Sequence, residues 1–492
     1  MALLFCDGFD KYGPVAGVTA TIQAALLAGE WTGASLSLAN IVAGLSNTGY
    51  AVSFGVITTA PYKTLATSYS RLIGGIRIQS TLASAGGVTF LDSATNQCSI
   101  TINTTGLISI RTGGTSGTAL STSTVSVSAN STHYLEWDIT FAASGAYQVW
   151  LDGVSLFSGT GATKSSSNSS ANQFQLNGNM IYDDLYLFDT TGSTNNAVLL
   201  TSPQIETQFP NADSSVQFSF GAAILGSAYA TVSTTGAPGA NELFLRKVTT
   251  GPTGQLASVA CIPQATSAGA NFKSVVYADS AGSPTGSTLA TGTQVTGTTS
   301  GTTLTSSFAS PPTLSASTAY WLGFITDTSV NLSLTDNATV AGSKAANTYG
   351  SGPPTNPTMT TGQSSWLIYG NMTGIAVDWY EEDINPPPGD ISYVSSSTSG
   401  NEDLYSFPAL TTPNPANIYS VVVKGYIRRT DSGARTVSIQ CKSGGTDSAA
   451  TTVTPGTTYG WIDGNFDTDP ATSSAWGASG VNSATSGFKI AS

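Results

Sequence analysis

Apolar and polar residues alternate over much of this chain with the two-residue period of a β-strand. In residues 135–141, every odd position is apolar and every even position is polar. Successive side chains of a strand point to opposite faces of its sheet, so this segment predicts a strand with one face in a core and the other in water. Glu136 and Asp138 would then lie on the wet face.

Turn signals separate such strands. Asp152-Gly153 stands between the runs YQVWL and VSLF and predicts a tight hairpin, because that turn needs positive φ angles. Residues 23–31 form at most a short helix, and no longer stretch has a helical period. The pattern predicts an all-β fold of tandem β-sandwich or jelly-roll domains. Further strand-like runs lie at 242–248, 272–279, 318–326, 365–372, 417–430, 435–442 and 458–463.

The segments 1–10 and 180–192 are strand-type runs broken by Asp. An early strand, a central hairpin and a closing strand in this order resemble the concanavalin A-like (laminin-G-like) jelly roll. The first string also resembles the start of that fold in structural proteins of tailed-phage virions. The matching residues are Leu4, Phe5, Asp7, Gly8, Phe9, Asp10 and Tyr12. The resemblance implies a jelly roll over residues 1–197.

A second string, DPATSSAWGASGVN, is similar to the C-terminal module of the same phage proteins and places that module at 376–492. Its matching residues are Asp469, Pro470, Thr472 and Trp476. Residues 198–220 form a connector. In the family, a stretch like its residues 204–220 typically leads into a string like the one found here at 386–400. Residues 221–375, which read as a second sandwich, therefore resemble an inserted domain, and a linear middle domain is the alternative.

The composition fits an exterior β-protein. Only 9% of residues are charged, whereas ordinary domains have about 25%, and 8 Trp, 19 Tyr and 18 Phe can fill several cores. The net charge of −12, with scattered basic residues, argues against nucleic-acid binding. No apolar run of about 18 residues predicts membrane insertion. Without a recognisable leader, release inside a particle by cell lysis is the expected route.

The sequence has only part of the set of carboxylates that a glycosidase of this fold needs. One glycosidase family of the concanavalin A-like fold carries an E-x-D-x-x-E strand, and Glu136 and Asp138 begin that pattern. The third position is Phe141, so the second carboxylate of a retaining hydrolase is missing. His133 is the only histidine, and we expect it to be a polar residue at a strand end. The sequence therefore predicts no enzyme activity.

No cofactor is predicted, and calcium has only candidate ligands. Asp463, Asn465, Asp467 and Asp469 alternate like the start of an EF-hand loop, but Thr468 replaces its glycine and Ser474 its final Glu. We expect Asp183 and Asp184 to accept hydrogen bonds from nearby backbone N–H groups rather than to bind calcium. The well-separated Cys6, Cys98, Cys261 and Cys441 predict buried free thiols.

These features favour a non-enzymatic phage virion structural protein on the particle exterior, either as a tail or neck appendage or as a capsid decoration. Its partners would be capsid, neck or tail proteins and copies of itself, with a trimer as the favoured oligomer. Trp379 and Tyr380 would lie at an interface between domains or subunits. Trp137 and Trp321 would lie in cores. The alternative function is a glycan-binding adhesin or receptor-binding protein that contacts a host-surface glycan.

Overall fold

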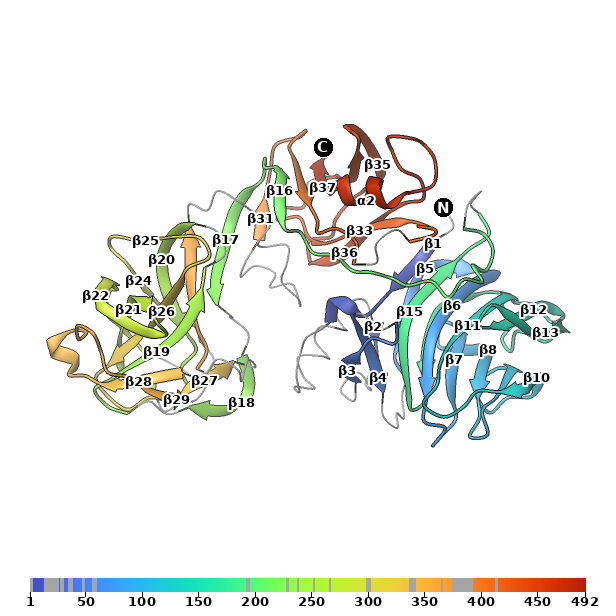
Figure 1. The fold of residues 1–492 in the computed structure, drawn as a ribbon, viewed down its shortest axis with the longest axis horizontal. Helices are drawn as coiled ribbons and strands as arrows, with labels where there is room; N and C mark the ends of the chain where they lie inside the picture. The colour runs from blue at the N-terminus through green and yellow to red at the C-terminus, as the bar shows by residue number, and fades with distance from the viewer. Residues whose placement is uncertain are drawn as a thin grey trace. The chain divides into compact units, whose positions relative to one another are not determined.

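The structure is a computed structural model. It describes residues 3–12, 26, 31–33, 39–46, 49–54, 60–191, 195–226, 230–236, 239–250, 253–264, 267–297, 302–335, 342–363, 366–373, 393–411 and 415–492. The chain forms two compact units (Figure 1). The first combines the residues up to Phe209 with Phe407–Ser492, and the second consists of described residues between Pro210 and Ser406.

The first unit begins with a jelly roll of two antiparallel sheets, which are called sheet I and sheet II below. In the described residues, sheet I has the order β13 (Val154–Gly161), β12 (Gly145–Leu151), β11 (Thr132–Thr140), β6 (Arg71–Ser80), β15 (Met180–Phe188), β4 (Tyr50–Phe54) and β3 (Ala39–Ala43), with β1 (Leu3–Asp7) pairing with β15. Sheet II has the order β10 (Ala119–Ser126), β9 (Leu107–Thr112), β8 (Thr95–Ile102), β7 (Gly86–Asp92), β14 (Ala171–Asn177), β5 (Tyr62–Tyr69) and β2 (Trp31–Thr32). The 3-10 helix η1 (Asp10–Tyr12) follows β1.

One apolar core lies between the two sheets. The odd positions of the predicted strand 135–141 enter it, so Trp137 is buried and its ring stacks on Phe174, with ring centroids 5.6 Å apart. The hairpin is also where the sequence predicts it. Asp152 and Gly153 have φ angles of 51° and 77° between β12 and β13, as a tight turn requires. The local patterns thus predict these elements correctly.

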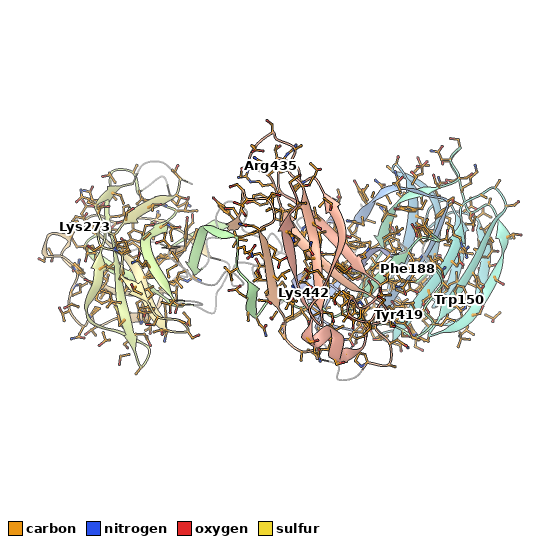
Figure 2. The ribbon with its side chains drawn as sticks, turned by 90° about the horizontal axis from the view of Figure 1, so that it is seen from above. Trp150, Phe188, Lys273, Tyr419, Arg435 and Lys442 are labelled. Carbon is orange, nitrogen blue, oxygen red and sulfur yellow. The ribbon has the colours of Figure 1, made fainter. Side chains whose placement is uncertain are left out.

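The C-terminal module belongs to the same unit. Its strand β33 (Val421–Ile427) pairs with β36 (Gly460–Phe466), and β34 (Val437–Ser443) lies between β35 (Thr446–Val453) and β37 (Thr485–Ile490), which follows the short helix α2 (Ala478–Ser483). The module touches the jelly roll directly, since Asn465 Nδ2 donates to the Leu3 carbonyl at 2.8 Å. Figure 2 shows Tyr419 where the module meets the jelly roll.

The second unit is a further sandwich. One of its sheets has the order β24 (Leu304–Ser307), β20 (Gly254–Cys261), β30 (Ile368–Thr373), β17 (Ser219–Gly226) and β31 (Tyr393–Ser395), with β25 (Thr313–Leu314) beside β20. The other has the order β22 (Ser283–Thr291), β21 (Asn271–Ser280), β26 (Ala319–Thr326), β19 (Glu242–Thr249), β28 (Gly342–Ala346) and β29 (Thr360–Gln363), with β23 (Val295–Thr296) beside β21. Phe244, Leu256, Phe272 and Ile368 fill the core between them.

The remaining elements of the second unit are short. They are the pair β18 (Ala230–Gly236) and β27 (Leu332–Thr335), the pair β16 (Ala212–Ser215) and β32 (Glu402–Ser406), and the 3-10 helix η4 (Tyr349–Ser351).

The predicted all-β class of tandem sandwiches is confirmed. The predicted domain boundaries at 197, 220 and 375, and the choice between an insertion and a middle domain, stay predictions. Trp379 and Tyr380 lie outside the described residues, as do all residues of the predicted short helix except Leu26 and Trp31. Within the described part of the chain, no helix has the length and hydropathy needed to span a membrane.

Candidate functional site

The part of the outer face of sheet I formed by β6, β11 and β15 carries an apolar cluster, which the chain itself covers. Ile73, Tyr134, Tyr186 and Phe188 lie on this face and are at most 3% exposed. The residues that pack on them are Leu3, Cys6, Val198 and Leu199, together with Val422 of the C-terminal module. This face therefore belongs to the internal packing of the unit.

Glu136 on this face corrects a sequence prediction. It was expected in water, but it is fully buried, and its Oε1 accepts hydrogen bonds from the Tyr186 hydroxyl at 2.6 Å and from the amides of Leu199 and Leu200 at 3.0 Å each. The reason is that residues 198–200 fold back over β11. Asp138, two residues further on, remains half-buried in an ion pair with Arg71. The two carboxylates therefore have structural partners.

The outer face of sheet II carries mostly polar side chains. The core side of this sheet carries residues such as Phe90, Ile100 and Phe174. The positions between them face outward, and strand pairing aligns seven of them across the whole sheet. This line, called the polar row below, runs through Ala119, Arg111, Ser99, Thr89, Gln175, Tyr62 and Thr32.

A second line of polar side chains flanks the polar row. Strand pairing places Thr122, Ser109, Thr101 and Asn177 on it, with Gly87 between the last two. The two lines are joined by hydrogen bonds, since Arg111 Nε donates to Thr101 Oγ1 at 3.1 Å and Asn177 Nδ2 donates to Thr89 Oγ1 at 2.8 Å. These bonds hold the four side chains in place.

Some hydrogen-bonding capacity of the polar row is unused within the described residues. The Ser99 hydroxyl is buried and has no partner there. Tyr62, Gln175 and Arg111 are half-buried, so each presents part of its side chain to solvent. The row contains no carboxylate, whereas a retaining glycosidase needs two. Its groups can hold a polar ligand by hydrogen bonds and by contact with an aromatic ring.

One end of this face is bounded by the loop 164–170. Gln97, which faces outward on β8, accepts hydrogen bonds at Oε1 from the amides of Ser165 and Ser166, at 2.9 and 3.2 Å. Its Nε2 donates to the Ser170 carbonyl at 3.1 Å. The buried Gln97 side chain, together with the Asp92 carboxylate, which accepts from Asn168 Nδ2, thus holds the loop beside the polar row.

The two aspartates of the N-terminal string, Asp7 and Asp10, accept hydrogen bonds within the jelly roll. The buried Asp7 carboxylate accepts hydrogen bonds from the Phe9 amide (3.0 Å), the Tyr12 hydroxyl (2.8 Å) and Trp31 Nε1 (2.9 Å). Asp10 accepts from the amides of Tyr50 and Thr207, and burial raises the pKa of Asp10 to about 6. These residues thus organise the start of the jelly roll.

Asp183 and Asp184 accept hydrogen bonds from backbone amides, as predicted. Asp183 accepts from Leu45, and Asp184 accepts from Ile205. Asp184 also forms an ion pair with Arg77 at 2.7 Å. Burial, together with the proximity of the two carboxyl groups, raises the pKa of Asp183.

The calcium candidates lie on β36 and in the turn after it. Asp463 is exposed, whereas the Asn465 side chain is bonded to Leu3 and Asp467 accepts from Asn195 Nδ2 at 3.2 Å. Asp469 accepts from the Ala471 amide in the turn. Among the described residues, no three His, Cys, Asp or Glu side chains form a group that could hold a metal ion.

The remaining residues considered in the sequence analysis are His133, two tryptophans and the four cysteines. His133 Nδ1 lies 2.8 Å from Asp152 Oδ2 at the end of the hairpin, as expected of a strand-end polar residue. Trp137 and Trp321 are in cores, as predicted. All four cysteines are free; Cys98, Cys261 and Cys441 are buried, and Cys6 is only half-buried.

No protein-family model matches the chain, and no curated protein matches its sequence. Among solved structures, it is similar to the endo-β-1,4-glucuronan lyase of the fungus Trichoderma reesei (13% identity, 35% of this chain, 92% of that chain, TM-score 0.26). It is also similar to the carbohydrate-binding module CBM66 of Bacillus subtilis (11% identity, 32% of this chain, 92% of that chain, TM-score 0.22). A third similar structure is the galectin LEC-6 of Caenorhabditis elegans (9% identity, 27% of this chain, 94% of that chain, TM-score 0.21). At these scores the likenesses carry no argument about function.

Sequence reasoning missed the polar row. A signal was available, because Ser99–Ile102 and Gln173–Leu176 alternate polar and apolar residues. The pattern gives each strand a polar face, but the alignment of strands from residues 32 to 175 depends on long-range pairing.

Proposed function

We propose that this chain is a non-enzymatic glycan-binding protein and that the outer face of sheet II is its binding surface. The observation that carries this proposal is the polar row, which brings the partly exposed side chains of Arg111, Gln175 and Tyr62 into one line across the sheet. Ser99 and Thr89 lie between them in the same line and are buried. On the opposite outer face, the apolar cluster of Ile73, Tyr134, Tyr186 and Phe188 on sheet I is covered by the chain itself.

The chemistry of the row suits a sugar. A sugar ring offers hydroxyl groups, which both donate and accept, and an apolar face of C–H groups. The Gln175 amide, the Arg111 guanidinium and the exposed Thr32 hydroxyl match the hydroxyl groups of the sugar. The Tyr62 ring matches its apolar face. Small-molecule sites combine a few fixed polar groups with aromatic surface, and the hydrogen bonds of Arg111 and Asn177 supply that fixation.

A glycan array tests the proposal with the full-length protein and two matched variants. Gln175 faces outward in the polar row, and Gln148 faces outward on sheet I; both are half-buried. We expect the wild-type protein and Gln148→Ala to bind the same glycans, and Gln175→Ala to lose at least tenfold in affinity. A blank array with folded protein, or equal loss in both variants, would contradict the proposal.

The virion exterior is the second candidate setting, and it is compatible with glycan binding. It is supported by the strings Leu4–Tyr12 and Asp469–Trp476, which resemble the two ends of phage structural proteins. The two end modules also belong to one compact unit. In this setting the partners would be capsid, neck or tail proteins, and a trimer would be the assembly.

Cryo-electron microscopy of particles from the producing host tests that setting. Density for this chain on the capsid, neck or tail would support it, and the local symmetry would give the copy number. Particles that lack the chain would leave a free glycan binder.

A further inference from the structure

Residues 198–207 cross the outer face of sheet I as a segment without regular secondary structure, called the strap below. Each part of it is held by a different strand. The Leu199 and Leu200 amides donate to Glu136 of β11, as described above, and Arg77 of β6 donates to the carbonyls of Ser202 and Pro203 at 3.0 and 3.1 Å. The strap therefore follows the order of the strands in the sheet.

The far end of the strap is held in the same way. Asp184 of β15 accepts from the Ile205 amide at 2.8 Å, and Asp10 of η1 accepts from the Thr207 amide at 3.3 Å. At Ile205 the strap passes so close to Gly8 that a Cβ atom there would lie 2.5 Å from the Ile205 carbonyl oxygen. The string that begins the chain thus includes a residue that leaves room for the strap.

These hydrogen bonds, rather than the backbone conformational preferences of its residues, hold the strap against the sheet. Leu200 and Ser202 have φ angles of 56° and 50°, a region that costs energy for residues other than glycine. Val198 and Leu199 add apolar contacts to the cluster on sheet I. A closed strap therefore depends on a few polar residues of the sheet.

The side of the strap region that faces away from the sheet meets the C-terminal module. Thr201 Oγ1 lies 2.8 Å from the Tyr419 hydroxyl, and Asn195 Nδ2 donates to the Tyr419 carbonyl at 2.9 Å. Glu206 accepts from the amide and the hydroxyl of Thr411, at 2.8 and 2.9 Å. The strap thus contacts both the jelly roll and the module, beside the direct contact between Asn465 of the module and Leu3 of the jelly roll.

From this arrangement we propose that the strap is a conformational device: its closure on sheet I builds part of the surface on which the C-terminal module docks, and β1 supplies another part through Leu3. When the strap opens, the module loses its contacts at Tyr419 and Thr411 and loosens with it. Glu136 is the positioning residue at the start of the strap, and Gly8 is the one at its end.

Hydrogen–deuterium exchange of the full-length protein tests this coupling. The matched variants are Glu136→Ala and Asp138→Ala, which each remove one carboxylate from the same face of β11. Glu136 accepts hydrogen bonds from the strap, whereas Asp138 forms an ion pair with Arg71. We expect Glu136→Ala to raise the exchange rate at least tenfold in the strap and in the segment around Tyr419. Asp138→Ala should change neither segment.

Gly8→Ala provides an independent perturbation at the other end, because it displaces the strap without removing a polar group. It should raise exchange in the same two segments, while β7 and β8 of the jelly-roll core stay protected. The proposal is overturned if the wild-type strap exchanges freely, or if the variants open the strap and leave the module unchanged. It is also overturned if neither variant affects the strap, or if both variants unfold β7 and β8 with it.

Discussion

Asp7 offers a direct test of why the N-terminal string has its sequence. Its carboxylate is 3% exposed and accepts three hydrogen bonds, from the Phe9 amide, the Tyr12 hydroxyl and the Trp31 indole. Asp7→Ala would leave three donors in a dry site. An unpaired buried donor costs about 1–3 kcal/mol, and breaking a buried charged network costs about 3–5 kcal/mol in total.

We therefore expect Asp7→Ala to lower the free energy of unfolding of the first unit by about 3–5 kcal/mol, a large part of the roughly 5–15 kcal/mol that stabilises a domain. Tyr12→Phe removes a single bond to a charged acceptor and should cost about 1.5 kcal/mol. Because both changes break the same Asp7–Tyr12 bond, the double variant should cost about 1.5 kcal/mol less than the sum of the single changes.

The assay is urea unfolding monitored by hydrogen exchange in peptides of β1 and β15. These peptides report the unfolding of the first unit separately from that of the second. Asp138→Ala is the control, since its half-exposed ion pair with Arg71 is expected to contribute about 0–1 kcal/mol. Additive effects of Asp7→Ala and Tyr12→Phe, or a cost of Asp7→Ala no larger than that of the control, would refute the account.

Three further predictions concern other residues of the described structure. Gly74→Ala should destabilise the first unit by about 1–3 kcal/mol in the same urea assay, because the added Cβ would lie 2.6 Å from the Trp137 ring and 2.7 Å from a backbone oxygen. The melting temperature should fall as the pH rises from 4 to 7. The folded protein holds a proton on Asp10 up to pH about 6, whereas the unfolded chain releases it near pH 3.8, so folding favours the protonated form; Asp10→Asn should flatten this decline. Burial raises the pKa of the Cys98 and Cys261 thiols, so both should resist a thiol reagent at pH 8 in the native protein and react in urea; labelling of the native protein would contradict this.

The strands could be predicted because their signals are local. Residues 135–141 alternate strictly, and Asp152-Gly153 supplies the φ angles of the turn between β12 and β13. Such features depend on neighbouring residues and on the preference of each for one face of a sheet. The roles of Asp183 and Asp184 as acceptors for backbone amides followed from the same kind of reasoning.

The errors and omissions arise from contacts that are distant in sequence. Glu136 has the pattern of a residue in water, but Leu199 and Leu200 cover it from more than sixty positions away. The polar row also needs the pairing of all seven strands of sheet II, from Thr32 to Gln175. A strand pattern gives the face on which a side chain lies, and only the tertiary structure shows what covers or aligns it.

A glycan bound to the outer face of sheet II would shield the strands that carry the partly exposed residues of the polar row. The most direct measurement is hydrogen exchange of the full-length protein with and without the oligosaccharide that binds best on the array. Binding to this face predicts slower exchange in β5, β9 and β14, which carry the partly exposed row residues Tyr62, Arg111 and Gln175. Slower exchange confined to the second unit or to the C-terminal module, with these three strands unchanged, would contradict it.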